Sequence, residues 1–218
     1  LIWVCVQGAF GALTVTMKLF PLIVTLHLFG GLTLVALLVV QAQSNQYLMS
    51  PQPKLLMGSG TWWFAWFGLG LLVMQVLLGG WVSSNYAVLA CNTFPTCQNT
   101  WWPDMNFAQG FRLWRELGAD GQGGVLAFQA LTAIHYVHRL FAYVVFVFLG
   151  LLAWRIHQQA KVKTWVRVLA GLLALQLMTG LSNVVLDWPL MAAVLHTGGA
   201  AALVATMVWF LNSAEVER

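Results

Sequence analysis

The sequence predicts an all-α integral membrane protein of about six transmembrane helices, built from repeated helical hairpins. Of its 218 residues, 60% are hydrophobic and only 7% are charged, whereas roughly 25% of a soluble domain is charged. Apolar stretches that reach or approach the roughly 20 residues needed to cross a bilayer lie at 1–17, 21–42, 61–84, 126–154, 165–186 and 189–212. These observations exclude a water-soluble fold.

The hairpin formed by the first two spans recurs in the last two at one constant offset. The matching pairs are Gln7 and Gln176, Gly11 and Gly180, His27 and His196, and Gly30 and Gly199. The third and fourth spans carry the same elements as Gln75, Gly79 and His138. We therefore expect a complete four-helix bundle over 61–218 and half of another bundle over 1–43, joined by a cytoplasmic linker at 44–60.

The distribution of basic residues predicts the orientation in the membrane. The densest basic cluster connects the fourth and fifth spans and consists of Arg155, Lys161, Lys163 and Arg167. Positive residues accumulate in cytoplasmic loops. We therefore expect a bacterial inner-membrane protein with this connection and both termini on the cytoplasmic side. The net charge of +4 is thereby explained by topology, with no sign of nucleic-acid binding.

The long segment at 85–124 is then expected outside the membrane. Cys91 and Cys97 lie in it, and an oxidising compartment permits a disulfide between them. A metal site is the competing interpretation, but the five-residue gap is wider than the usual zinc spacing and no second cysteine pair exists. The third cysteine, Cys5, lies in a span.

The same outer segment has a helical pattern of apolar side chains. Phe107, Phe111, Trp114 and Leu117 share one face of a helix, and the charged residues fall elsewhere. This pattern predicts a short amphipathic helix that lies on the outer membrane surface.

Ionisable side chains inside a span are costly and usually functional. His27 and His196 lie roughly 10 Å below the outer surface at 1.5 Å rise per residue, with His138 slightly deeper. Imidazoles at matched depth on different helices are able to hold a cofactor, and two axial histidines suit a six-coordinate haem iron. A lone histidine is more often a hydrogen-bonded core residue, but its recurrence at one repeat position favours ligation.

Two further residues of the fourth span belong to this group. Arg139 needs an anion at its depth, and a haem propionate would provide one. His135 precedes His138 by three residues, on nearly the same helix face. We expect His135 to donate a hydrogen bond and to assist proton transfer rather than to bind iron.

Several segments together resemble the haem A synthase family of the proteobacterial type. They are QGAFGALTVTMKLFP, HLFGG, WVSSNYAVLACNTFPTCQNTWWPDMNF, TAIHYVHRLFAYVV and HTGGA. The resemblance implies eight helices in two pseudo-equivalent halves, and an oxidoreductase that oxidises a methyl group of haem O to a formyl group. It also implies a role in cytochrome c oxidase assembly, with haem O synthase and assembly factors as possible partners.

The resemblance also assigns roles to the histidines. His138 and His196 correspond to the ligands of a resident haem b, and His27 to a histidine of the substrate-haem half. The partner of His27 and an acidic residue of the chemistry belong to a family helix that is expected before Leu1, so no catalytic residue is assigned. On this basis we expect the 218 residues alone to bind haem b without making haem A.

Two other classes remain open from the residues alone. A bis-histidine membrane cytochrome b that transfers electrons for a quinone enzyme would share the histidine pairs. It would not account for the outer cysteine loop or for His27. A small-solute transporter would use broken helices near the midplane, and no span is interrupted.

Overall fold

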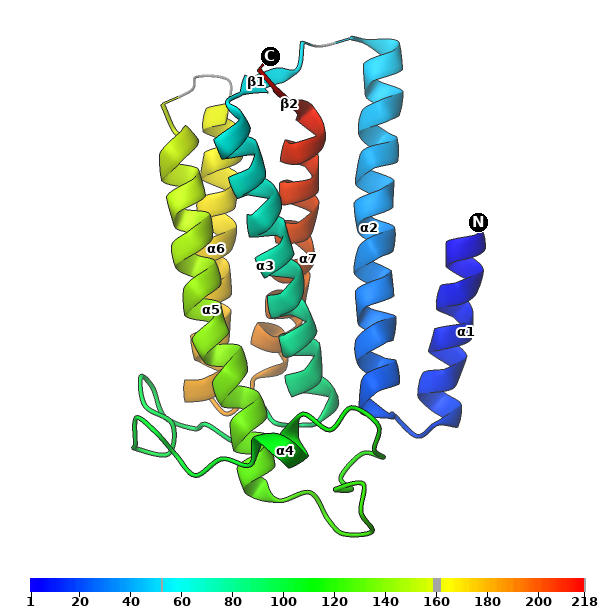
Figure 1. Cartoon of the computed structure of the whole chain (residues 1–218), viewed down its shortest axis with the longest axis vertical. Coiled ribbons are helices and arrows are strands. Elements are labelled where there is room, and N and C mark those ends of the chain that lie inside the picture. The colour runs from blue at the N-terminus through cyan, green and yellow to red at the C-terminus, as the bar shows by residue number, and fades with distance from the viewer. Residues whose placement is uncertain (52, 159–161, 218) are drawn as a thin grey trace.

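The structure is a computed structural model that describes residues 1–51, 53–158 and 162–217. Along the chain it contains α1 (Ile2–Thr16), α2 (Pro21–Met49), β1 (Leu55–Met57), α3 (Ser59–Ser84), α4 (Phe107–Gly110), α5 (Phe128–Ile156), α6 (Lys163–Val185), α7 (Leu190–Ser213) and β2 (Ala214–Val216). The long helices run alternately up and down (Figure 1). The basic connection predicted to be cytoplasmic includes Lys161, which lies outside the described residues.

The predicted membrane architecture is confirmed. Within the described residues, five helices, α2, α3, α5, α6 and α7, are long and apolar enough to cross a membrane, and α1 is a shorter apolar helix of 15 residues. The helix α2 continues to Met49, so the expected linker at 44–60 is partly helical. It ends where Ser50 precedes Pro51, because proline disfavours helical geometry in the residue before it.

The helices pair as expected from the hairpin repeat in the sequence. α1 packs on α2, α3 on α5, and α6 on α7. The last two hairpins form a four-helix bundle through contacts of α3 with α7 and of α5 with α6, which places α5 and α7 at diagonal corners. The helix α2 packs against both α3 and α7, and α1 lies outside it (Figure 1).

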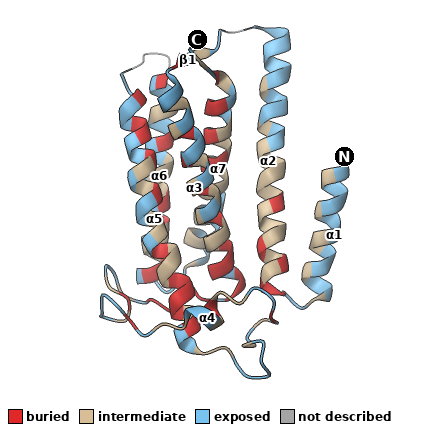
Figure 2. Cartoon of the chain, in the orientation of Figure 1, coloured by how far each residue is buried: buried red, intermediate tan, exposed pale blue. Residues whose placement is uncertain are grey.

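Apolar packing is concentrated in two clusters along the bundle. The larger cluster includes Leu72, Val76, Val145, Leu149, Leu203 and Met207, and the smaller one consists of Trp81, Val82, Ala87 and Ile134. On α5 and α3, His138 and Gly79 fall between the two clusters in sequence. Figure 2 shows buried residues on the inner faces of the helices and exposed ones on the outer faces. Exposed apolar side chains such as Phe67 and Val147 fit a lipid environment.

Polar contacts fix α2 to the bundle at two levels. Near the outer loop, the hydroxyls of Thr25 and Ser84 are 3.2 Å apart and buried. Toward the other end, the amide of Gln43 donates to the Ser213 hydroxyl over 2.7 Å and accepts from Asn212 over 3.1 Å. The helix that carries His27 is therefore held in a fixed position relative to the four-helix bundle.

A two-stranded parallel sheet at the end opposite the long loop was not predicted. Leu55 of β1 pairs with Ala214 of β2, and Met57 pairs with Val216. The backbone N–H of Glu217 also donates to the Met57 carbonyl over 2.9 Å. The sheet joins the connection after α2 to the C-terminal segment, although each strand has only three residues.

The prediction of an amphipathic helix between Phe107 and Leu117 is wrong beyond Gly110, where the helix ends. Only the four residues of α4 are helical. The predicted polar face is also wrong at Arg115, which is 2% exposed and donates 2.5 Å to the Asn85 side chain. Burial lowers the pKa of Arg115. Trp81 donates 2.9 Å to the Gly110 carbonyl, so contacts with the end of α3 override the helical pattern.

Candidate functional site

Histidines from three helices lie at related positions in the bundle. His27 is on α2, His138 on α5 and His196 on α7, and each residue is partly buried. Because α5 and α7 occupy diagonal corners, His138 and His196 belong to helices on opposite sides of the bundle.

The ring of His138 rests on α3. The side-chain nitrogen of Gln75 lies 3.1 Å from Nδ1 of His138 and donates over 3.2 Å to its backbone carbonyl. A Cβ atom built on Gly79 would stand 3.0 Å from Cε1 of the ring, which is tighter than an ordinary contact. Glycine at this position therefore allows the imidazole to lie directly against the α3 backbone.

The ring of His196 rests on α6 in the same way. Gln176 donates 2.9 Å to the His196 carbonyl, and a Cβ atom on Gly180 would stand 3.2 Å from Cε1 of the ring. The hydroxyl of Thr179 adds a contact of 2.9 Å to Nδ1. Gly199 lies against the Gln176 amide, leaving no room for a larger side chain.

The first hairpin repeats this arrangement around His27. A Cβ atom on Gly11 would lie 3.4 Å from Cε1 of His27, and the Gln7 amide fills the space beside Gly30. Among the residues that the structure describes, Nδ1 of His27 is buried without a hydrogen-bond partner. The close contact between a glycine and a histidine ring is thus common to all three hairpins, and the hydrogen bond from the glutamine to the histidine carbonyl is described for the second and third.

The two adjacent glycines of α3 connect the first hairpin to the bundle. Gly79 faces the His138 ring, whereas a Cβ atom on Gly80 would lie 3.0 Å from Leu28 and 3.3 Å from Thr25 of α2. Close approach of backbones is the usual role of small residues in membrane bundles. The helix of His27 and the ring of His138 therefore use neighbouring residues of one helix.

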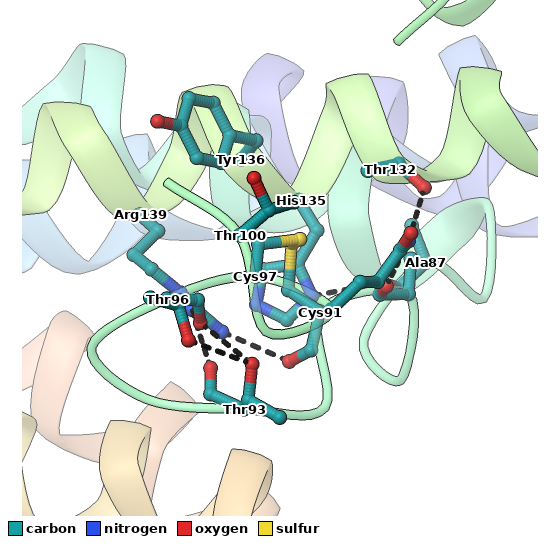
Figure 3. Close-up of a disulfide and its surroundings, with 12 residues drawn as sticks. Ala87, Cys91, Thr93, Thr96, Cys97, Thr100, Thr132, His135, Tyr136 and Arg139 are labelled. Atoms are coloured by element: carbon teal, nitrogen blue, oxygen red, sulfur yellow. Dashed lines mark hydrogen bonds between the residues drawn. A yellow bond between two sulfur atoms is a disulfide. The ribbon is translucent and has the colours of Figure 1, made fainter. Parts of the chain in front are cut away.

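The predicted disulfide between Cys91 and Cys97 is confirmed. Its ring lies on α5, where Arg139 is 8% exposed. Nη1 of Arg139 donates 2.8 Å to the Thr93 carbonyl and 2.9 Å to the Thr96 carbonyl, and Nη2 donates 2.9 Å to the Cys91 carbonyl. Figure 3 shows the guanidinium directed into this loop. The partners of Arg139 in the structure are thus backbone carbonyls, and its contact with a propionate stays a prediction.

His135 holds the same outer loop. Its ring donates from Nδ1 to the Ala87 carbonyl over 3.0 Å, and the side chain is 5% exposed. One turn earlier, the Thr132 hydroxyl accepts 2.9 Å from Gln98. The hydrogen-bonding role expected for His135 is confirmed, and the beginning of α5 is a platform for the disulfide loop.

Comparison with known proteins assigns the chain to a family. Residues 1–208 match the model of the COX15-CtaA family, described as cytochrome oxidase assembly protein. The chain belongs to this family. The predicted recognition of this group of proteins is thereby confirmed.

Three of the curated relatives of this chain carry the name heme A synthase. The one from Shewanella oneidensis is 40% identical over 207 residues, which cover 93% of this chain and 61% of the relative. The relative from Caulobacter sp. is 35% identical over 148 residues, 65% of this chain and 39% of its own length. The one from Brucella ovis is 31% identical over 146 residues, covering 66% and 37% respectively. The chain thus spans about three fifths of the first relative.

Some residues of this COX15-CtaA site were missed by sequence reasoning. Thr179 contacts His196 directly, and Asn85 and Arg115 fix the outer loop to α3. Thr179 follows Gln176 by three residues, so it falls on the same helix face. That spacing was a usable signal. No comparable periodicity marks Asn85 or Arg115.

Proposed function

We propose that this chain is the bulk of a haem A synthase, in which His138 and His196 bind a resident haem b and His27 faces the substrate haem O. The reaction would oxidise a methyl group of haem O to the formyl group of haem A by two hydroxylations and loss of water, with the four electrons passing to an external electron acceptor. The name carried by the relatives supports this activity. The family assignment does not favour the alternative of a cytochrome b subunit.

The histidine layer fits a haem. His138 and His196 come from diagonal helices of the bundle, so these two residues would hold the iron of a haem b bound between them. Gly79 and Gly180 let Cε1 of each ring lie close to the backbone of the neighbouring helix. This arrangement is the observation that carries the proposal. A haem b held there would supply single-electron transfer.

The residues around the ligands have their own roles in this proposal. Gln75 and Gln176 hold the backbones of the ligand positions, and so orient the rings before a cofactor arrives. Arg139 fixes the outer loop next to His138. We retain Arg139 as a candidate for a propionate, since a guanidinium has five donors and three hydrogen bonds are described here.

The substrate side rests on the first hairpin. His27 has a buried Nδ1 with no partner within the described parts of the chain, and it lies on a helix fixed to the bundle through Thr25. We propose 1–43 as the substrate-haem unit and 61–218 as the haem b unit, with 85–124 as the outer loop of the latter. Haem O synthase and oxidase assembly factors are the partners we infer from this role, in the inner membrane.

Histidine substitution tests the haem b site. His138→Ala and His196→Ala should each abolish or shift the low-spin optical spectrum of the purified chain. His157→Ala is the matched control, because His157 is exposed at the end of α5. His27→Ala should leave haem b in place and reduce retention of haem O. Unaltered low-spin spectra in both ligand variants would remove these residues as ligands.

A further inference from the structure

Thr179 approaches His196 at the nitrogen opposite the one expected to bind iron. We infer that Thr179 is a positioning residue, which holds His196 in the tautomer with a proton on Nδ1 and a free lone pair on Nε2. The inference rests on the proposed function, in which the lone pair on Nε2 binds the haem iron. The hydrogen bonds that support the inference join residues of this chain and involve no cofactor.

The direction of the hydrogen bond follows from the single proton of a hydroxyl. Oγ1 of Thr179 lies 2.7 Å from the Leu175 carbonyl oxygen, and two oxygens at that distance need a hydrogen between them. Thr179 therefore donates to Leu175. Toward Nδ1 of His196, at 2.9 Å, its hydroxyl has only a lone pair to offer.

His196 must then be the donor at Nδ1. A neutral imidazole that carries its proton on Nδ1 has an unprotonated Nε2, which is the form that binds a metal through that nitrogen. Gly180, the next residue of α6, lies against the same ring: a Cβ atom built on it would stand only 3.2 Å from Cε1 of His196. Two consecutive residues of α6 thus determine both the protonation and the tilt of one ring.

This device is specific to the last hairpin. The position three residues after the repeat glutamine is Leu78 in α3 and Phe10 in α1, and neither side chain has a hydroxyl. Nδ1 of His138 instead lies 3.1 Å from the amide nitrogen of Gln75, which is a donor, so this hydrogen bond does not place a proton on Nδ1. The two proposed ligands of haem b consequently have different hydrogen-bond partners, and His196 alone has a threonine acceptor among the histidines of the repeat.

The first test reads the tautomer without haem. In the haem-free full chain labelled with ¹⁵N-histidine, the His196 signals, assigned by their loss in His196→Ala, should show a protonated Nδ1. Thr179→Val should change the tautomer ratio, and Thr179→Ser should restore it. An unprotonated Nδ1 in the unmodified protein would overturn the inference.

The second test uses the haem-loaded full chain. Loss of a partner of a ligating histidine typically costs 10–100-fold in metal affinity or activity, so Thr179→Val should retain haem b about tenfold less well against an excess of a competing apoprotein. Its haem reduction potential should also rise, because the ligand becomes less basic. Thr179→Ser should behave as the unmodified chain.

A matched control separates this effect from the loss of a helix-internal hydrogen bond. Thr206 of α7 donates 2.7 Å to Ala202, the same type of bond, about 15 Å along the helix from His196. Thr206→Val should therefore leave haem retention unchanged. If Thr179→Val equals the unmodified chain while His196→Ala loses the low-spin spectrum, only this inference fails. If neither variant changes the spectrum or retention, the proposed haem b site fails with it.

Discussion

The guanidinium of Arg139 donates a hydrogen bond of 2.9 Å from Nη2 to the backbone carbonyl of Cys91 (Figure 3). Cys91 closes the disulfide ring with Cys97, and Arg139 directly follows the proposed ligand His138 in α5. The outer loop and the proposed haem b ligand are therefore fixed to the same helical turn. Movement of the loop at this contact would be transmitted to the ligand position.

Arg139→Lys should loosen the disulfide loop while retaining the charge. A planar guanidinium serves three carbonyls at once, whereas a lysine ammonium is a compact charge with a different reach. Loss of one hydrogen bond to a charged donor costs about 2 kcal/mol. This free energy corresponds to roughly 30-fold faster amide hydrogen exchange through local opening of the loop. We expect that acceleration for the amides of residues 91–97.

Arg112→Lys is the control for this substitution. Arg112 also donates to a loop carbonyl, that of Asp120, over 3.0 Å, but it lies away from the disulfide ring. Its replacement should leave exchange at 91–97 unaltered. Equal protection of those amides in Arg139→Lys and the unmodified chain would contradict a clamping role for the guanidinium.

Replacement of both loop cysteines by alanine should destabilise the outer loop. Closing a ring of this size stabilises by about 2 kcal/mol in the chain-entropy model, and both side chains are fully buried. Limited proteolysis should cleave the doubly substituted loop faster. Cys5→Ala, at an exposed free cysteine, is the control and should have no effect. Mass spectrometry of non-reduced peptides should detect the linked Cys91 and Cys97 peptides, and two free thiols in protein from an oxidising compartment would refute the pairing.

Topology provides a separate prediction. The end of the molecule with β1 and β2 should face the cytoplasm and the disulfide loop the periplasm, since basic residues such as Arg155 and Lys163 lie at the former end. Reporter fusions near Lys163 should be active only with a cytoplasmic reporter, and fusions near Cys91 only with a periplasmic one. The reverse pattern would invert the proposed orientation.

Much of the fold could be predicted because hydropathy and repeats are strong signals in membrane helices. The spans, the hairpin pairing and the disulfide follow from residue types at fixed spacings. The helix expected after Gly110 failed because Arg115 turns inward to Asn85, a tertiary contact that overrides local periodicity. The strand pair of Leu55 and Ala214 joins segments too short to carry a strand signal.

The site was predictable to the level of which residues matter. The repeat identified His27, His138 and His196, because each recurs with its own glutamine and glycine. The partners of Arg139 were not predictable, since backbone carbonyls of an irregular loop leave no trace in residue types. Thr179 was marked only by its spacing from Gln176, because a threonine in an apolar helix commonly bonds to its own backbone.

The glycines beneath the histidine rings give the sharpest test of the proposed site. A Cβ atom on Gly79 would stand 3.0 Å from Cε1 of His138, and one on Gly180 would stand 3.2 Å from Cε1 of His196. Alanine at either position should push the ring toward the interior by a few tenths of an ångström and alter the low-spin haem spectrum, more at Gly79. Gly171→Ala on α6, where an added Cβ would meet no neighbouring side chain or other segment within 4 Å among the described residues, controls for the added methyl group and should be neutral or slightly stabilising, since alanine favours helix by about 1 kcal/mol. Identical spectra for Gly79→Ala, Gly180→Ala and Gly171→Ala would show that ring position has no influence on the haem, and the proposed ligation through these two histidines would have to be abandoned.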